Sequence, residues 1–197
     1  MPRGFSEDQI SSLRQKLLKV AVEKLHVTGI RKTTVEEIAR AANISTGAFY
    51  KFYPSKEALF FEAYEISEER LKSELIELLE AHQIITRMDL GQISRQLIHS
   101  ETMLTLMQLM QKDELEYMLR NIDINSISEH SRNDEKFAQH MFEVIESKGL
   151  KVQTDIPLMM SYLQALFVLC YEKKNFALHA EKIIDSFLDM MIDQFIS

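Results

Sequence analysis

The chain has 197 residues, of which 46% are hydrophobic and 27% are charged, and its formal net charge is −7. This balance is typical of a folded globular protein and excludes an intrinsically disordered chain. The low content of 5 glycines and 3 prolines argues against a loop-rich β fold, and a single cysteine, Cys170, excludes an intramolecular disulfide.

The charge is distributed unevenly along the chain. Residues 1–57 hold 10 Lys/Arg and 6 Asp/Glu, whereas residues 58–197 hold 13 Lys/Arg and 24 Asp/Glu. A basic segment joined to an acidic remainder is expected when one domain binds phosphate and the other does not. No apolar run approaches the about 20 residues that cross a bilayer, and the N-terminus lacks the apolar stretch of a signal peptide. We therefore expect a cytoplasmic protein without a membrane partner.

Two capping boxes mark the beginnings of the first two predicted helices. Ser6 is followed by Gln9, and Thr34 by Glu37, at the spacing that lets each side chain of a pair satisfy a free amide of the helix start. Apolar residues recur at helical spacing after Ser6, and Gly29 is a suitable C-terminal stop. We expect one helix from Ser6 to about Gly29 and a second from Thr34.

A tight turn and a third helix follow. Asn43 lies where the chain must turn, and asparagine tolerates the left-handed conformation better than most residues. Ser45 can cap the third helix with Phe49 pointing inward, and Pro54-Ser55 ends that helix and begins the next. A helix, a tight turn and a second short helix are the layout of a helix-turn-helix DNA-binding motif.

The remainder of the chain predicts longer helices, for a total of about nine in an all-α fold. We expect a break at residues 87–91 and a polar loop at residues 121–133. The helical segments are residues 56–81, 92–120 (with or without an interruption near Ser100), 134–147, 155–171 and 177–195. These patterns divide the chain into a helix-turn-helix domain at residues 1–55 and a helical domain at residues 56–197.

The last two predicted helices are apolar on more than one face. Such a helix needs more than one packing partner. It lies either in the centre of a monomer core or at a homodimer interface, and a dimer suits a two-fold DNA site because each half-site needs its own reader. The residues predicted at this interface are Met159, Leu163, Leu166, Ile184, Phe187, Leu188, Met191 and Phe195.

The helix-turn-helix motif predicts how DNA is bound. A recognition helix presents its first residues to the major groove, where Thr46 can bond a base edge and Ala48 can contact a thymine methyl. Tyr50, Lys51 and Lys56 can bond phosphates, and the first residue of the second helix can hold a phosphate from the other side. The predicted DNA-binding residues are Thr34, Ser45, Thr46, Gly47, Ala48, Tyr50, Lys51 and Lys56.

The same stretch carries a longer motif, which covers about a quarter of the chain. Its residues are Thr34, Ile38-Ala39, Ala42–Ser45, Gly47, Tyr50, Phe52-Tyr53 and Ser55–Leu59. This motif resembles the tetracycline-repressor (TetR/AcrR) family of bacterial transcription regulators. The resemblance implies a homodimer that represses transcription at a palindromic operator until a small molecule bound in the helical domain releases it.

The motif departs from the family pattern at two positions. Asn43 stands where the family usually has glycine, which the turn tolerates. Phe52 stands where the family often has histidine or tyrosine, so a polar phosphate contact at this position is in doubt.

The helical domain is rich in methionine and aromatic residues. In such a family these side chains would line an apolar effector pocket, and the alternative is that they fill the core. Methionine is adaptable and suits loosely specified hydrophobic ligands, and the acidic charge of this domain favours a neutral or cationic molecule. The candidate ligand-binding residues are Met103, Met107, Met110, Tyr117, Phe142, Tyr162 and Phe167.

The motif inventory argues against an enzyme, a cofactor and a metal site. The sequence has no Gly-rich phosphate loop, His-Glu-x-x-His motif or nucleophile elbow. A di-iron bundle needs paired Glu-x-x-His motifs, whereas Glu23–His26 stands alone, and His140 with Glu143 lacks further spaced ligands. Two alternatives to a ligand-released repressor stay open, namely a regulator of the same fold controlled by a protein partner, and an activator.

Overall fold

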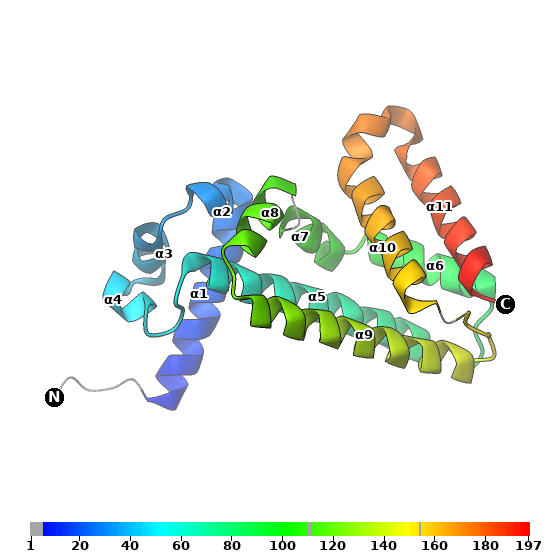
Figure 1. Ribbon diagram of the computed structural model, residues 1–197, viewed down its shortest axis with the longest axis horizontal. Coiled ribbons are helices and arrows are strands. Elements are labelled where there is room, and N and C mark those ends of the chain that lie inside the picture. Colours follow the sequence, from blue (N-terminus) through cyan, green and yellow to red (C-terminus); the bar gives the residue numbers. More distant parts are fainter. Residues whose placement is uncertain (1–5, 110–111, 154) are drawn as a thin grey trace. The chain divides into compact units, whose positions relative to one another are not determined.

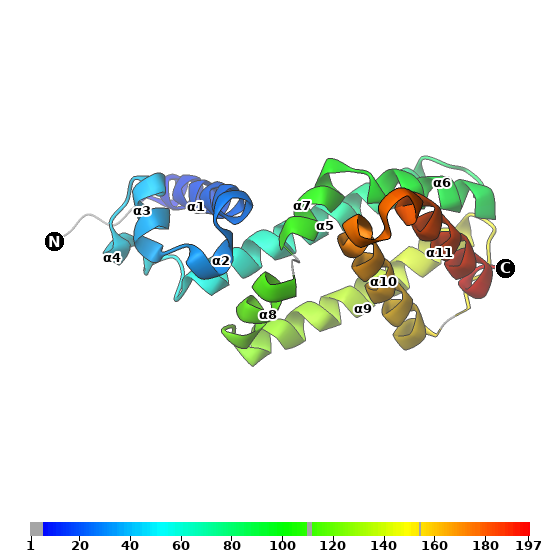
Figure 2. The ribbon, with the colours of Figure 1, turned by 90° about the horizontal axis from the view of Figure 1, so that it is seen from above.

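The computed structural model describes residues 6–109, 112–153 and 155–197 (Figures 1 and 2). These residues form eleven α-helices and one 3₁₀-helix, with one isolated extended bridge between Val152 and Ile196. The predicted all-α fold is confirmed, with more helices than the about nine expected. The helices are α1 (Glu7–Val27), α2 (Gly29–Lys32), α3 (Val35–Ala42), α4 (Thr46–Phe49), α5 (Lys56–Glu80), α6 (Arg87–Ile98), α7 (Glu101–Leu109), α8 (Lys112–Arg120), α9 (Ile124–Ser147), α10 (Ile156–Tyr171) and α11 (Ala180–Phe195), with the 3₁₀-helix at Glu172–His179.

The chain folds into two compact units. The N-terminal unit comprises the described parts of residues 1–67 and 108–127, and the second unit comprises those of residues 68–107 and 128–197. Helix α8 therefore belongs to the same unit as α1 to α4 and contacts α2, although most of α7 and of α9 belong to the second unit. This division describes packing, and the functional boundary after residue 55 stays a prediction.

The N-terminal unit begins its helices at the predicted caps. The Ser6 hydroxyl accepts a hydrogen bond from the Gln9 amide, and the Thr34 hydroxyl accepts one from the Glu37 amide, so both capping boxes are confirmed. Helix α1 ends just before Gly29, whose φ of 76° is left-handed. The sequence does not predict α2, because a single helical turn shows no periodicity.

The core of the N-terminal unit is formed by fully buried side chains from α1 to α5. Burying one such side chain stabilises a fold by about 1.5–3 kcal/mol. These side chains are Leu17, Ile30, Ile38, Phe49, Leu59 and Phe60.

In the second unit, the predicted break at residues 87–91 is wrong. Helix α6 begins there, because the Thr86 hydroxyl accepts from the Asp89 amide and forms a third capping box. Gly91, which suggested the break, lies inside α6 at a close approach: a Cβ at this position would lie 2.7 Å from Arg95 Nη1 and 3.6 Å from Ile192 Cδ1 of α11. The expected interruption near Ser100 is present between α6 and α7.

The predicted polar loop at residues 121–133 is also wrong. Helix α9 begins at Ile124 and continues to Ser147. The first half of α9 is polar. Two of its polar side chains, His130 and Asp134, form an ion pair and lie close to Glu68 of α5. The local pattern of polar and apolar residues does not show ion-pair partners that are more than 60 residues away in sequence.

Helices α10 and α11 lie side by side and antiparallel in both views (Figures 1 and 2). Asp155 caps α10 by accepting from the Leu158 amide. Arg95 of α6 pairs with Asp185 and Asp189 of α11, at 2.8 and 2.5 Å, and so ties α6 to α11. Burial raises the pKa of Cys170 in α10 to about 11, so its thiol stays protonated at neutral pH.

Within the residues that the structure describes, no helix is both long enough and apolar enough to span a bilayer.

Asn43 is a direct test of the turn between α3 and α4. A β-branched residue is strained at its φ of 58°, so we expect Asn43→Val to lower the free energy of unfolding by about 1–2 kcal/mol. Asn43→Gly should stay within about 0.5 kcal/mol of the wild type, because glycine accepts this conformation. Urea unfolding followed by circular dichroism measures both. Asn133→Val, at an exposed site inside α9, is the matched control and should cost clearly less; an equal loss would contradict the argument.

Candidate nucleic-acid interface

The turn between α3 and α4 is closed by main-chain hydrogen bonds. Asn43 adopts the left-handed conformation, with φ 58° and ψ 46°. The amide of Asn43 donates to the Arg40 carbonyl at 3.0 Å, and the amide of Ile44 donates to the Ala39 carbonyl at 2.9 Å. The last carbonyls of α3 are therefore satisfied within the turn, which fixes the direction in which α4 leaves it.

Helix α4 is capped and anchored at opposite ends. The Ser45 hydroxyl accepts from the Ala48 amide at 3.1 Å, as the sequence predicts. At the other end Phe49 is fully buried, and its ring meets the edge of Tyr50 at a centroid distance of 5.5 Å and lies 6.0 Å from Tyr53. The inward direction predicted for Phe49 is confirmed.

The outer face of α4 is made of small side chains. Ser45, Thr46 and Gly47 are exposed and Ala48 is half-buried, so a duplex could approach the main chain closely. Tyr50, 57% exposed, follows them. This is the surface that a recognition helix needs: short groups at its start and a phenol that can reach a phosphate.

Two further predicted residues border this face. Lys51 is exposed directly after Tyr50, and Thr34 is exposed at the first turn of α3. The Thr34 main-chain N–H donates to Glu37 Oε2 at 3.0 Å, and this hydrogen bond lowers the pKa of the Glu37 carboxyl. Phe52 is half-buried, in keeping with its apolar character at a position where the family often has a polar group.

The Lys56 ammonium binds protein carbonyls in the structure. Lys56 Nζ donates to the main-chain oxygens of Ile30 at 2.7 Å, Arg31 at 3.1 Å and Thr33 at 2.7 Å. It also lies 5.4 Å from the centroid of the Tyr117 ring. All three ammonium hydrogens have partners, so the contact predicted between Lys56 and phosphate would cost these bonds.

Helix α8 contacts α2 and the beginning of α5 within the N-terminal unit. Glu114 Oε2 accepts from the main-chain N–H groups of Ile30 and Arg31 in α2. Tyr117 donates its phenol proton to Glu57 Oε1 at 2.8 Å, and this hydrogen bond raises the pKa of Tyr117. The local sequence gives no sign of either contact, because the partners are 60 or more residues apart.

The candidate ligand residues are not gathered in one place by the structure. Tyr117 lies in the N-terminal unit, whereas Phe142 and Tyr162 belong to the core of the second unit. Met103 is buried, and Met107 and Phe167 are half-buried, in the second unit. Met110 lies outside the described residues.

Most of the candidate dimer residues face the core of their own chain. Leu163 and Phe187 are half-buried. The Phe187 ring stacks on Tyr162 at 5.8 Å. The other six are buried, namely Met159, Leu166, Ile184, Leu188, Met191 and Phe195. The apolar side chains that α10 and α11 expose instead include Val168 and Met190.

A family comparison identifies the motif. Residues 17–63, which run from within α1 to the beginning of α5 and include the turn and α4, match the model of bacterial regulatory proteins of the tetR family. The match covers about a quarter of the chain and supports a regulator of the tetR family. The matched residues are those of the helix-turn-helix region of bacterial transcription regulators.

A curated relative supports the same family. The HTH-type transcriptional regulator AcrR of Shigella flexneri is 33% identical over 66 residues, which are 34% of this chain. The matched stretch spans 31% of that relative, less than a third of its length.

Solved structures extend the likeness to the whole fold. A tetR-family regulator from Mesorhizobium loti has a TM-score of 0.64 at 19% identity, covering 95% of this chain and 98% of that one. FadR of Thermus thermophilus, a TetR-family transcriptional repressor solved with lauroyl-CoA, has a TM-score of 0.54 at 21% identity, with 91% of both chains covered.

Lys56→Met tests whether this lysine holds the fold of the N-terminal unit. The change removes a charged donor from three carbonyls, and we expect it to lower the free energy of unfolding by about 2 kcal/mol. Lys16→Met, at an exposed site of α1, should change it by less than about 0.5 kcal/mol. Urea unfolding of the two variants makes the comparison, and equal losses would show that the three hydrogen bonds stabilise nothing.

Proposed function

We propose that this tetR-family regulator is a homodimeric repressor that binds a palindromic operator through α4 and is released by a small hydrophobic ligand. The observation that carries the DNA-binding part is the outer face of α4, where small exposed residues precede a largely exposed tyrosine on a helix fixed by the buried Phe49. In this proposal Thr46 and Ala48 read base edges, and Tyr50, Lys51 and Thr34 bind phosphates.

Lys56 takes a different part in the proposal. Its ammonium closes the C-terminal end of α2 and ties the beginning of α5 to it. It is therefore a positioning residue for the DNA-binding surface, and its loss should act on DNA binding through the fold. Ser45 acts in the same way as the cap of α4, while its short side chain and Gly47 leave room for the duplex.

The homodimer part rests on the exposed apolar faces of α10 and α11. Val168, Met190 and Ile183 are 56%, 46% and 37% exposed. They border an open, largely apolar groove between the two helices, together with Ala165 and Leu169. Because the inward-facing residues of these helices are already buried, we assign the interface to this outward face, and the dimer places two α4 helices on two half-sites.

Two observations support release by a ligand, namely the likeness to a ligand-bound regulator and the contacts of α8. FadR of Thermus thermophilus was solved with lauroyl-CoA, an amphipathic molecule with a long apolar chain. In this chain, α8 contacts α2 and α5 through Glu114 and Tyr117, while the helices before and after it belong to the second unit. A ligand that binds better when α7 and α9 are displaced would shift α8, and so the populations of the DNA-binding and released states. Control by a protein partner, or activation, would use the same route.

The proposed contacts divide into phosphate and base contacts, which respond differently to mutation. We expect Lys51→Ala and Tyr50→Phe to weaken binding to all duplexes alike, with Lys51→Ala lowering the salt slope by about 1 per protomer. Thr46→Ala should change the preferred sequence at a cost of about 1–3 kcal/mol on the preferred site. Fluorescence anisotropy on DNA from upstream of the protein's own gene, at several salt concentrations and beside a scrambled duplex, measures both effects.

Lys136→Ala, an exposed lysine of α9, is the matched control and should leave binding unchanged. Sites selected from random DNA replace the upstream duplex if the latter binds no better than the scrambled one. Normal binding by all three variants would place the DNA-binding surface elsewhere. The same assay, titrated with long-chain acyl compounds, detects release by a ligand.

A charged residue introduced at Val168, on the exposed apolar face of α10, tests the proposed dimer interface. We expect the wild type to have twice the mass of the 23.0 kDa chain in sedimentation analysis, and Val168→Glu to be a folded monomer with at least about tenfold weaker operator binding. Val27→Glu, at an 80% exposed valine of α1, is the control and should remain dimeric. A dimeric Val168→Glu variant would move the interface away from this face.

A further inference from the structure

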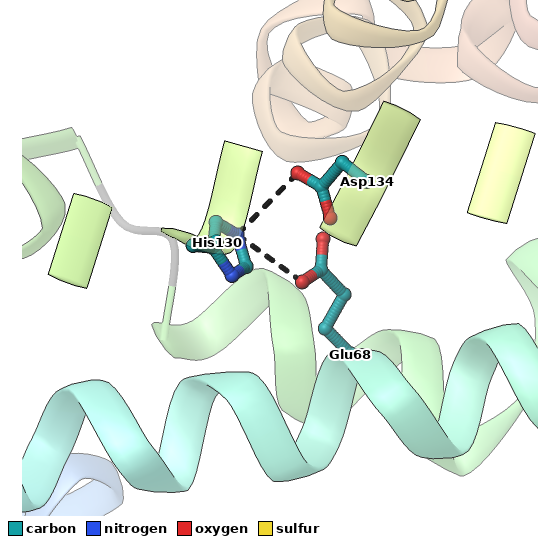
Figure 3. Close-up of side chains that lie close together, drawn as sticks. All are labelled: Glu68, His130 and Asp134. Atoms are coloured by element: carbon teal, nitrogen blue, oxygen red, sulfur yellow. Dashed lines mark ion pairs between the residues drawn. The ribbon is translucent and has the colours of Figure 1, made fainter. Parts of the chain in front are cut away.

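Three potential metal ligands from two helices converge in the second unit. Figure 3 shows Glu68 of α5 pointing toward His130 and Asp134 of α9. The side chains are only 15–20% exposed, so they are partly withdrawn from water. Residues 130 and 134 are one helical turn apart, which places both on the face of α9 that meets α5.

Two of the three donor-atom distances are close to those of a four-coordinate metal site. His130 Nε2 lies 3.3 Å from Glu68 Oε2 and 3.5 Å from Asp134 Oδ2. The donor atoms of all three residues lie within 4.8 Å of one another. Ligand atoms in a tetrahedral zinc site, with bonds of about 2.0–2.1 Å, are about 3.3 Å apart. A cation between the three groups would therefore need only small movements of these side chains.

Lys72 is the fourth charged group of the cluster. Its ammonium binds Asp134 Oδ1 at 2.6 Å and Glu68 Oε2 at 3.4 Å, and it lies 5.5 Å from the centroid of the Phe137 ring. Asp134 thus uses one oxygen for Lys72 and turns the other toward His130. The lysine balances one of the two carboxylates, so the cluster carries one net negative charge when the imidazole is neutral.

We infer that Glu68, His130 and Asp134 form a binding site for a divalent transition metal of the zinc class. Nε2 of His130, Oε2 of Glu68 and Oδ2 of Asp134 are the protein ligands, and water completes the coordination. One imidazole with two carboxylates favours zinc-like ions over magnesium or calcium, which take oxygen ligands. Lys72 stays bound to the outer oxygen of Asp134, and its positive charge opposes the bound cation.

The electrostatics of the cluster favour a divalent cation. Burial and the neighbouring Asp134 carboxylate raise the pKa of Glu68. Two carboxylates in a partly dehydrated place repel each other, and a divalent ion relieves this repulsion more fully than a single ammonium does. The bound ion would link α5 to α9, and its binding does not depend on operator binding.

Zinc titration of the full chain tests the site. The protein, with any affinity tag removed and metals extracted by EDTA followed by dialysis, is titrated with Zn²⁺ by calorimetry. We expect His130→Gln and Asp134→Asn to weaken this binding at least about tenfold. Lys72→Met should tighten it several-fold, because the competing positive charge is lost.

His140→Ala is the matched control, because His140 is an exposed histidine of the same helix. It should leave the affinity within about twofold of the wild type, and circular dichroism confirms that every variant is folded. Cobalt absorption in the wild type, lost in His130→Gln, reports nitrogen coordination at this site. Absence of zinc binding, or an affinity equal in wild type, His130→Gln and Asp134→Asn, overturns the proposal. An equal loss in His140→Ala overturns it too, since the zinc then binds elsewhere.

Discussion

The arrangement of the N-terminal unit depends on the burial of one side chain, that of Phe49. Helix α4 has four residues, and a helix of one turn has no stability of its own in water. It is held because Phe49 is fully buried at one end while Ser45 caps the other. The small outer residues can stay exposed because none of them is needed for packing. Residues that are not needed for packing can vary without loss of the fold, as the proposed recognition of different DNA sites requires.

Helix α2 is equally short, and side chains from elsewhere satisfy both of its ends. Glu114 of α8 accepts from its N-terminal amides, and Lys56 of α5 donates to its C-terminal carbonyls. These charges have the signs that a helix dipole favours at each end. Gly29 fits the same arrangement, because a Cβ there would lie 2.6 Å from Glu114 Oε1. Since α8 closes α2 in this way, a segment far along the chain is structurally part of the N-terminal unit.

Local signals allowed much of the fold to be predicted, and long-range partners account for the errors. The capping boxes at Ser6 and Thr34 and the left-handed Asn43 are confirmed because each is complete within four residues. The beginning of α9 was mistaken for a loop because polar residues such as His130 look like loop residues until their partners on α5 are known. The predicted DNA-binding residues stay a prediction, and the carbonyl partners of the Lys56 ammonium are contacts that no local pattern could indicate.

The two faces of α10 and α11 illustrate a different limit. Periodicity shows that a helix has apolar residues on more than one side, but it does not show which side meets its own chain. Leu166 and Val168 are two residues apart and equally apolar in pattern, yet the first is 8% exposed and the second 56%. Other contacts show which sides of the two helices face their own chain: Arg95 of α6 pairs with Asp185 and Asp189 of α11, and Tyr162 of α10 packs against Phe195. The outward apolar residues are the ones left for a partner outside the chain, and in the proposed homodimer a second copy presents the same surface.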